Sequence, residues 1–188
     1  MNVTGPAQRP VLVLSNALGT TAAVWDPQLS ALGAFDVVRY EHPPYASVAE
    51  LGRGMLRLVR GRFSLCGLSL GGMVGMWLAV HAPERLDRLV LACTSANMQL
   101  AVPPEDYAPG LEAIGAFDFR DALAQIAAPT LVIAGAEDPA TTVADAQFLA
   151  ERIPAARLAV IPGAAHLANV EQPERFNAEL VRHLTGAA

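Results

Sequence analysis

Ser69 stands at the centre of a Gly-x-Ser-x-Gly pattern at residues 67–71. An apolar run, residues 63–66, precedes this pattern, and a helix-like run follows it over residues 70–81. A serine in a sharp turn between a strand and a helix projects its hydroxyl clear of the sheet, and the flanking glycines leave room for the strained backbone. The setting predicts that Ser69 is a nucleophile and that the N–H of Leu70 faces a developing oxyanion. A chance match in a glycine-rich chain is the alternative.

A serine hydroxyl is a poor nucleophile at neutral pH, so it needs a general base, and the base needs an orienting acid. For this type of turn the expected chain order is serine, acid, histidine. Asp138 lies one short loop beyond the apolar run 130–134, and His166 lies one short loop beyond the run 158–161. We therefore predict that both side chains meet Ser69 at one edge of a sheet.

Other residues compete for the roles of acid and base. Glu137 could be the acid, although it follows the predicted strand more closely than its neighbour does. His42 could line the pocket, but it precedes the serine, against the expected order. His81 and His183 fall near the ends of predicted helices, where a solvated imidazole interacts favourably with the helix dipole. A purely structural loop histidine is the alternative role for His166.

Short apolar runs alternate with helix-like segments, which predicts an α/β fold in which helices cover both faces of a mostly parallel sheet. The apolar runs lack alternation, as in strands buried on both faces. The length fits a single domain over residues 1–188. In such sheets functional loops gather at the carboxyl ends of the strands. We expect six strands, at residues 11–14, 36–40, 63–66, 89–93, 130–134 and 158–161, and helices at residues 25–32, 48–60, 70–81, 119–127, 143–152 and 173–184.

The loop after the first predicted strand consists of small and polar residues. In this arrangement the loop supplies the second N–H of an oxyanion hole, which we assign to Leu18, with Ala17 as the near alternative. Ala17 and Leu167 are also expected to contact the substrate. Residues 94–117 are the least regular part of the chain, and Met98 in this stretch is expected to overhang the pocket, although plain surface packing is an alternative.

The composition limits the partners. The formal charge is −5 and all 13 basic residues are arginine. An acidic chain without a basic cluster argues against nucleic acid, and the lack of lysine excludes P-loop and Schiff-base chemistry. Cys66 and Cys93 lie in apolar runs, so we expect buried free thiols and neither a metal site nor a disulfide framework.

No stretch of the sequence reaches transmembrane length, and residues 1–10 lack the apolar segment of a signal peptide. We therefore expect a cytoplasmic protein without a membrane partner. The mean hydropathy is positive. An apolar surface patch or a homo-oligomer would account for that value.

These residues together resemble the α/β-hydrolase superfamily, and within it 3-oxoadipate enol-lactonases and related carboxylesterases. The resemblance implies a catalytic triad of Ser69, Asp138 and His166, and oxyanion donors at Leu18 and Leu70. It also implies ester or lactone hydrolysis through an acyl-enzyme, without a cofactor. The similar stretches cover nearly the whole chain and lie at residues 14–20, 67–73, 82–85, 129–138 and 162–167.

The chain departs from the pattern of this family in three places. An antiparallel hairpin usually comes first, and ten residues before the first strand cannot hold one comfortably. A D-x-R-G-x-G turn usually follows the second strand, where residues 41–44 read Glu-His-Pro-Pro. Relatives insert a multi-helix cap after the strand that ends near Cys93, and only residues 94–117 remain for a reduced cap. The resemblance therefore implies a nearly lidless enzyme with an open acyl pocket.

Several activities are compatible with these residues. The lactone substrate of the family is anionic and the sequence alone places no arginine in the site, so simple ester hydrolysis is favoured over lactonase activity. C–C bond hydrolysis and perhydrolysis use the same triad. Dehalogenases and epoxide hydrolases are disfavoured, because their relatives have Asp where Ser69 stands. The alternative outside the enzymes is a catalytically idle fold that serves as a binding module. The complete triad argues against it, because binding does not require all three residues.

Overall fold

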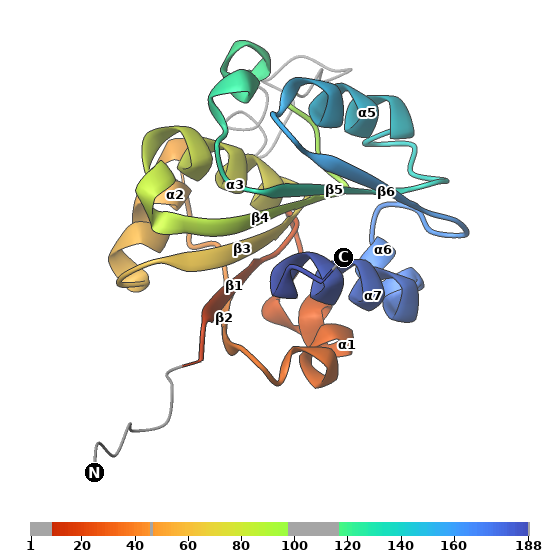
Figure 1. Ribbon diagram of the computed structural model, residues 1–188, viewed down its shortest axis with the longest axis horizontal. Coiled ribbons are helices and arrows are strands. Elements are labelled where there is room, and N and C mark those ends of the chain that lie inside the picture. Colours follow the sequence, from red (N-terminus) through yellow and green to blue (C-terminus); the bar gives the residue numbers. More distant parts are fainter. Residues whose placement is uncertain (1–8, 46, 98–116, 188) are drawn as a thin grey trace.

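Six parallel strands form one sheet in the order β2-β1-β3-β4-β5-β6, in a computed structural model that describes residues 9–45, 47–97 and 117–187 (Figure 1). Each strand pairs in parallel with its neighbours. The predicted α/β class with a parallel sheet is therefore confirmed. The strands are β1 (Val11–Ser15), β2 (Asp36–Tyr40), β3 (Phe63–Leu68), β4 (Leu86–Ala92), β5 (Thr130–Gly135) and β6 (Arg157–Ile161).

Helices cover both faces of this sheet (Figure 1). One face carries α2 (Val48–Leu58), α3 (Leu70–His81) and α5 (Val143–Arg152), and the other carries α1 (Asp26–Leu29), α6 (Ala168–Glu171) and α7 (Pro173–Thr185). Successive strand residues point to opposite faces. Val13 and Leu65 accordingly belong to the buried cluster on the α3 side, whereas Leu12 and Cys66 belong to the cluster that contains Phe176 of α7. Both faces are therefore apolar, which explains the uninterrupted apolar runs in the sequence.

Two predicted helices differ from the structure. Residues 25–32 form three short turns, with 3-10 helices η1 (Ala22–Trp25) and η2 (Ser30–Leu32) on either side of α1. Residues 119–127 form only the 3-10 helix η5 (Arg120–Gln125), and Pro129 follows shortly after it. Ile126 already has an extended backbone, so this segment ends two residues before its predicted end. A further 3-10 turn, η3 (Pro83–Arg85), joins α3 to β4.

The order of the strands reverses at β1, which pairs with β2 on one side and with β3 on the other. The chain segments that leave the carboxyl ends of β1 and β3 therefore diverge toward opposite sides of the sheet. Ligand sites in open α/β sheets form in the crevice at such a switch point. Ser69 follows β3 directly and thus lies at this point.

His183 near the end of α7 is buried, whereas the sequence predicted a solvated imidazole there. The residue is 7% exposed, and its Nε2 lies 3.2 Å from the carbonyl oxygen of Pro129. Burial, followed by the nearby charge of Arg88, lowers the pKa of His183 to about 4. The prediction was wrong because the last turn of α7 packs onto the sheet, where His183 lies beside Pro129, the residue before β5.

We expect the free energy of unfolding to fall as the pH is lowered from 6.5 toward 4. In that range the unfolded chain takes up a proton at position 183 while the folded chain does not, which costs about 1.4 kcal/mol per pH unit. His183→Gln should reduce this slope by about that amount relative to the wild type. Urea denaturation at a series of pH values measures both slopes, and equal slopes would contradict the expectation.

Candidate active site

Ser69 occupies a strained turn between β3 and α3, with φ 53° and ψ −112°. A Cβ atom at Gly67 would lie 2.1 Å from the carbonyl oxygen of Gly71, and a Cβ at Gly71 would lie 2.2 Å from the carbonyl oxygen of Ser15. Neither position has room for a side chain. The turn therefore has the strained backbone that the glycine pattern predicted, and it packs directly against the end of β1.

Hydrogen bonds to the backbone of Ser69 hold this strained conformation. Its N–H donates to the carbonyl oxygen of Ala92 at 2.8 Å, and its own carbonyl oxygen accepts from the Thr94 hydroxyl at 2.8 Å. The residue is 8% exposed. No described residue, His166 included, hydrogen-bonds to its hydroxyl.

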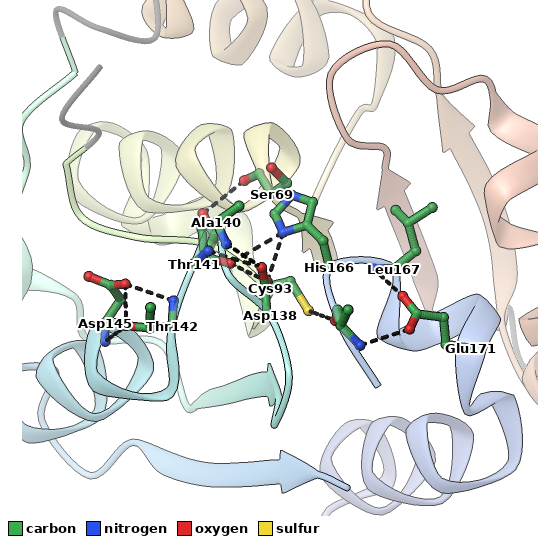
Figure 2. A network of polar contacts seen from close by, with 12 residues as sticks. Ser69, Cys93, Asp138, Ala140, Thr141, Thr142, Asp145, His166, Leu167 and Glu171 are labelled. Carbon is green, nitrogen blue, oxygen red and sulfur yellow. Dashed lines mark hydrogen bonds and ion pairs between the residues drawn. The ribbon is translucent and has the colours of Figure 1, made fainter. Parts of the chain in front are cut away.

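His166 is held by a buried carboxylate. Its Nδ1 lies 2.7 Å from Oδ2 of Asp138, whose side chain is fully buried (Figure 2). A carboxylate can only accept, so the imidazole donates from Nδ1, and its Nε2 remains as an acceptor. Figure 2 shows the opposite edge of the ring directed toward Ser69. The His166 ring and the Ser69 hydroxyl do not form a hydrogen bond here. In many enzymes the bond between base and nucleophile becomes short only when the substrate binds.

Asp138 accepts four hydrogen bonds. Its Oδ1 accepts the N–H groups of Ala140 at 2.8 Å and Thr141 at 3.1 Å, and its Oδ2 accepts the Thr141 hydroxyl at 2.7 Å as well as His166. Burial alone would raise the pKa of Asp138, but hydrogen bonds from Thr141, His166 and Ala140 outweigh it and lower the pKa. The carboxylate is therefore ionised at neutral pH.

Residues on both sides of His166 are also fixed. The Glu171 carboxylate accepts the N–H of Ala165 at 2.8 Å and the N–H of Leu167 at 3.0 Å. A Cβ atom at Gly135 would lie 2.1 Å from the carbonyl oxygen of Ala165, so the histidine loop packs tightly on the end of β5. The contacts of Glu171 and Thr141 were not predicted from the sequence. A loop pattern does not show which side chains bind the backbone beside His166 or the carboxylate of Asp138.

The loop after β1 contains both residues assigned to the second oxyanion donor. The Thr20 hydroxyl donates to the carbonyl oxygen of Ala17 at 2.9 Å, and the Asn16 amide donates to the carbonyl oxygen of Thr20 at 2.5 Å. These bonds close a tight turn around Leu18. Leu70 begins α3, where a backbone N–H has no acceptor in its own helix. Because β1 and β3 are adjacent, both loops leave the same edge of the sheet.

Two of the cavities formed by the described residues open at the carboxyl ends of the strands. The first, of about 340 Å³, is the β1 cavity, lined by residues 16–21, Glu41, His42 and Tyr45. The second, of about 440 Å³, is the β4 cavity, lined by Ser95, Ala96, Asn97, Arg120, Ala140, Ala144, Asp145 and Phe148. Neither lining includes Ser69 or His166. The β1 cavity contains both Ala17 and Leu18, so it borders the proposed oxyanion loop.

The predicted substrate contacts have different positions. Ala17 lines the β1 cavity, whereas half-buried Leu167 packs against the core on the α7 side and lines neither cavity. Met98 and most of the reduced cap lie outside the described residues. His42 lines the β1 cavity, as the sequence left open, and its Nε2 lies 2.9 Å from the Ser15 hydroxyl. Burial lowers the pKa of His42 to about 4, so this imidazole is neutral at pH 7.

Cys66 and Cys93 are free and buried, as predicted. Within the described ranges, no group of three or more His, Cys, Asp or Glu side chains is arranged to hold a metal ion. In the same ranges, no helix has the length and apolar character needed to cross a bilayer.

No family profile matches the sequence. The 3-oxoadipate enol-lactonase 2 of Acinetobacter baylyi is 31% identical to it, over 92% of this chain and 88% of that protein. The chain belongs to the α/β-hydrolase superfamily. Among solved structures, this α/β-hydrolase is similar to a hydrolase from Pseudomonas aeruginosa, with 36% identity, a TM-score of 0.84 and coverage of 96% and 92% of the two chains. The enol-lactonase from Burkholderia xenovorans gives 28% identity, a TM-score of 0.87 and coverage of 95% and 92%.

The relatives are larger within the aligned region than this α/β-hydrolase. The alignment with the Acinetobacter protein extends over 235 residues, whereas this chain has 188. That relative therefore carries internal residues that this chain lacks. The difference agrees with the minimal cap that the sequence implied.

Proposed function

We propose that this α/β-hydrolase cleaves small carboxylic esters or lactones through a covalent acyl-enzyme on Ser69. Its place among enol-lactonase-like proteins makes it a hydrolase that acts on ester bonds. The observation that supports the serine mechanism most directly is the 2.7 Å contact between the buried Asp138 carboxylate and the His166 ring, with Ser69 in a strained turn at the same edge of the sheet.

In the proposed first step, His166 Nε2 takes the Ser69 proton while the Ser69 oxygen attacks the carbonyl carbon of the ester. The negative charge that develops on the carbonyl oxygen is stabilised by the N–H groups of Leu18 and Leu70. Each such donor contributes about 3 kcal/mol to the stability of the transition state. Asp138 keeps the imidazole in the reactive tautomer and stabilises the imidazolium.

In the proposed second step, the tetrahedral intermediate collapses and the alcohol leaves with a proton from His166. A water molecule then attacks the acyl-enzyme, with His166 again as the base, and the acid is released as Ser69 is restored. For a lactone the same bonds break, but the alcohol remains part of the product. This sequence needs no group beyond the residues named here and water.

Covalent labelling tests the proposal. The protein is expected to hydrolyse p-nitrophenyl acetate and butyrate and to react with one equivalent of a fluorophosphonate. Peptide mapping by mass spectrometry should place the label on Ser69, and labelling should abolish hydrolysis. A protein that turns over no ester and takes up no label would instead be a catalytically idle binding module, and a label on another residue would contradict the assigned nucleophile.

A further inference from the structure

The charged side chains around the candidate active site are mostly acidic. Asp138 lies beneath the His166 ring, and Glu171 binds the backbone on both sides of that histidine. Glu41 lines the β1 cavity, where its carboxylate accepts the N–H of Ala22 at 3.0 Å. Asp145 lines the β4 cavity. Carboxylates therefore lie in the lining of both cavities and beside His166.

Arginine does not offset these charges. All 13 arginines lie in the described part of the chain, and among them only Arg120 lines either of the two cavities. Its guanidinium is already paired with Asp118, with Nε at 3.0 Å from Oδ1 and Nη2 at 2.6 Å from Oδ2. In the β1 cavity the neutral His42 adds no positive charge.

The other arginines line neither of these two cavities. Arg88, Arg157 and Arg182 line a separate hollow at the amino ends of the strands, the opposite end of the sheet from Ser69. Arg39 is paired with Asp26, and its Nη1 also lies 3.4 Å from the carbonyl oxygen of Ala22, the residue whose N–H binds Glu41. In sequence, residues 98–116 contain three acidic residues and no basic one, so this segment supplies no cation either.

We infer that the site selects esters with an uncharged acyl chain and rejects those whose acyl chain ends in a carboxylate. This selectivity rests on the proposed ester hydrolysis and refines its substrate class. An acyl carboxylate in the β1 cavity would approach Glu41, and no arginine lines that cavity. Glu41 is exposed, so the repulsion between the two carboxylates acts partly through solvent and is largest at low ionic strength. The chain would thus favour simple esters over anionic lactones, although its relatives are named enol-lactonases.

A matched pair of substrates tests this selectivity. Both are p-nitrophenyl esters of a six-carbon acyl chain, ending in a carboxylate (from adipic acid) or in a carboxamide of nearly the same shape. We expect kcat/KM for the carboxamide to be about fivefold higher at low salt, the ratio that corresponds to about 1 kcal/mol between two exposed charges. The ratio should shrink as the ionic strength rises, because salt screens the repulsion.

Two variants that each remove one negative charge show whether Glu41 causes the difference in kcat/KM between the two esters. Glu41→Gln should narrow the ratio by raising kcat/KM for the carboxylate ester. Glu84→Gln, which removes the same charge from the 3-10 turn before β4, should leave the ratio unchanged. Equal turnover of the two esters, or a preference for the carboxylate, would overturn the inference while leaving the serine mechanism intact. If neither ester is cleaved and Ser69 takes no fluorophosphonate, the proposed function fails and the selectivity fails with it.

Discussion

Ser69→Ala is expected to lower kcat for p-nitrophenyl butyrate by at least about 10⁴-fold, because the proposed acyl-enzyme cannot form without the hydroxyl. Removing the nucleophile leaves at most the residual catalysis by the oxyanion hole and by substrate binding. The value of KM should change little, since the hydroxyl contributes little to ground-state binding. Steady-state kinetics with the purified variant, together with loss of fluorophosphonate labelling, measure the effect.

The strained backbone supplies controls for that variant. Alanine keeps the Cβ atom, so Ser69→Ala retains the strain at φ 53° and its stability should match the wild type. Ser69→Gly should be equally inactive but more stable by about 1 kcal/mol or more, because glycine adopts positive φ without strain. The exposed Ser30 gives a matched control, and Ser30→Ala should keep full activity. If Ser69→Ala hydrolysed the ester within tenfold of the wild-type rate, another nucleophile would have to be responsible.

The fold and the positions of Asp138 and His166 could be predicted from the sequence because both follow from simple rules. Strands buried on both faces read as short apolar runs, and β2 (Asp36–Tyr40) and α3 (Leu70–His81) begin and end where expected. Parallel strands present their carboxyl ends at a single edge. Asp138 and His166, each one loop beyond such an end, therefore had to come close to each other.

Contacts between side chains distant in sequence could not be predicted in this way. Nothing in the sequence indicates that Glu171 binds the backbone beside His166, or that the His42 ring contacts the Ser15 hydroxyl. The buried position of His183 depends on how closely α7 packs against the sheet, which periodicity does not determine. The same limit applies to charge, because the positions of Glu41 and the arginines relative to the site appear only in three dimensions.

Asp138→Asn is expected to lower kcat/KM by about 10³- to 10⁴-fold. The asparagine amide has nearly the same shape as the carboxylate, but it can donate a hydrogen bond to His166 Nδ1. The ring would then carry its proton on Nε2 and could no longer accept the Ser69 proton. The imidazolium formed in the reaction would also lose its negative partner. The kinetics of ester hydrolysis measure the loss, and thermal unfolding shows whether the fold survives.

Glu137→Gln is the matched control, because Glu137 is the neighbouring carboxylate, is exposed, and was the rival acid in the sequence. It should keep nearly full activity; if it lost activity and Asp138→Asn did not, the acid would be misassigned.

Thr141→Val removes only one of the hydrogen bonds that hold the Asp138 carboxylate, so a smaller loss of about tenfold in kcat/KM is expected, with recovery in Thr141→Ser. Graded losses in this order would indicate that the charge of Asp138 orients His166 and that Thr141 positions the carboxylate.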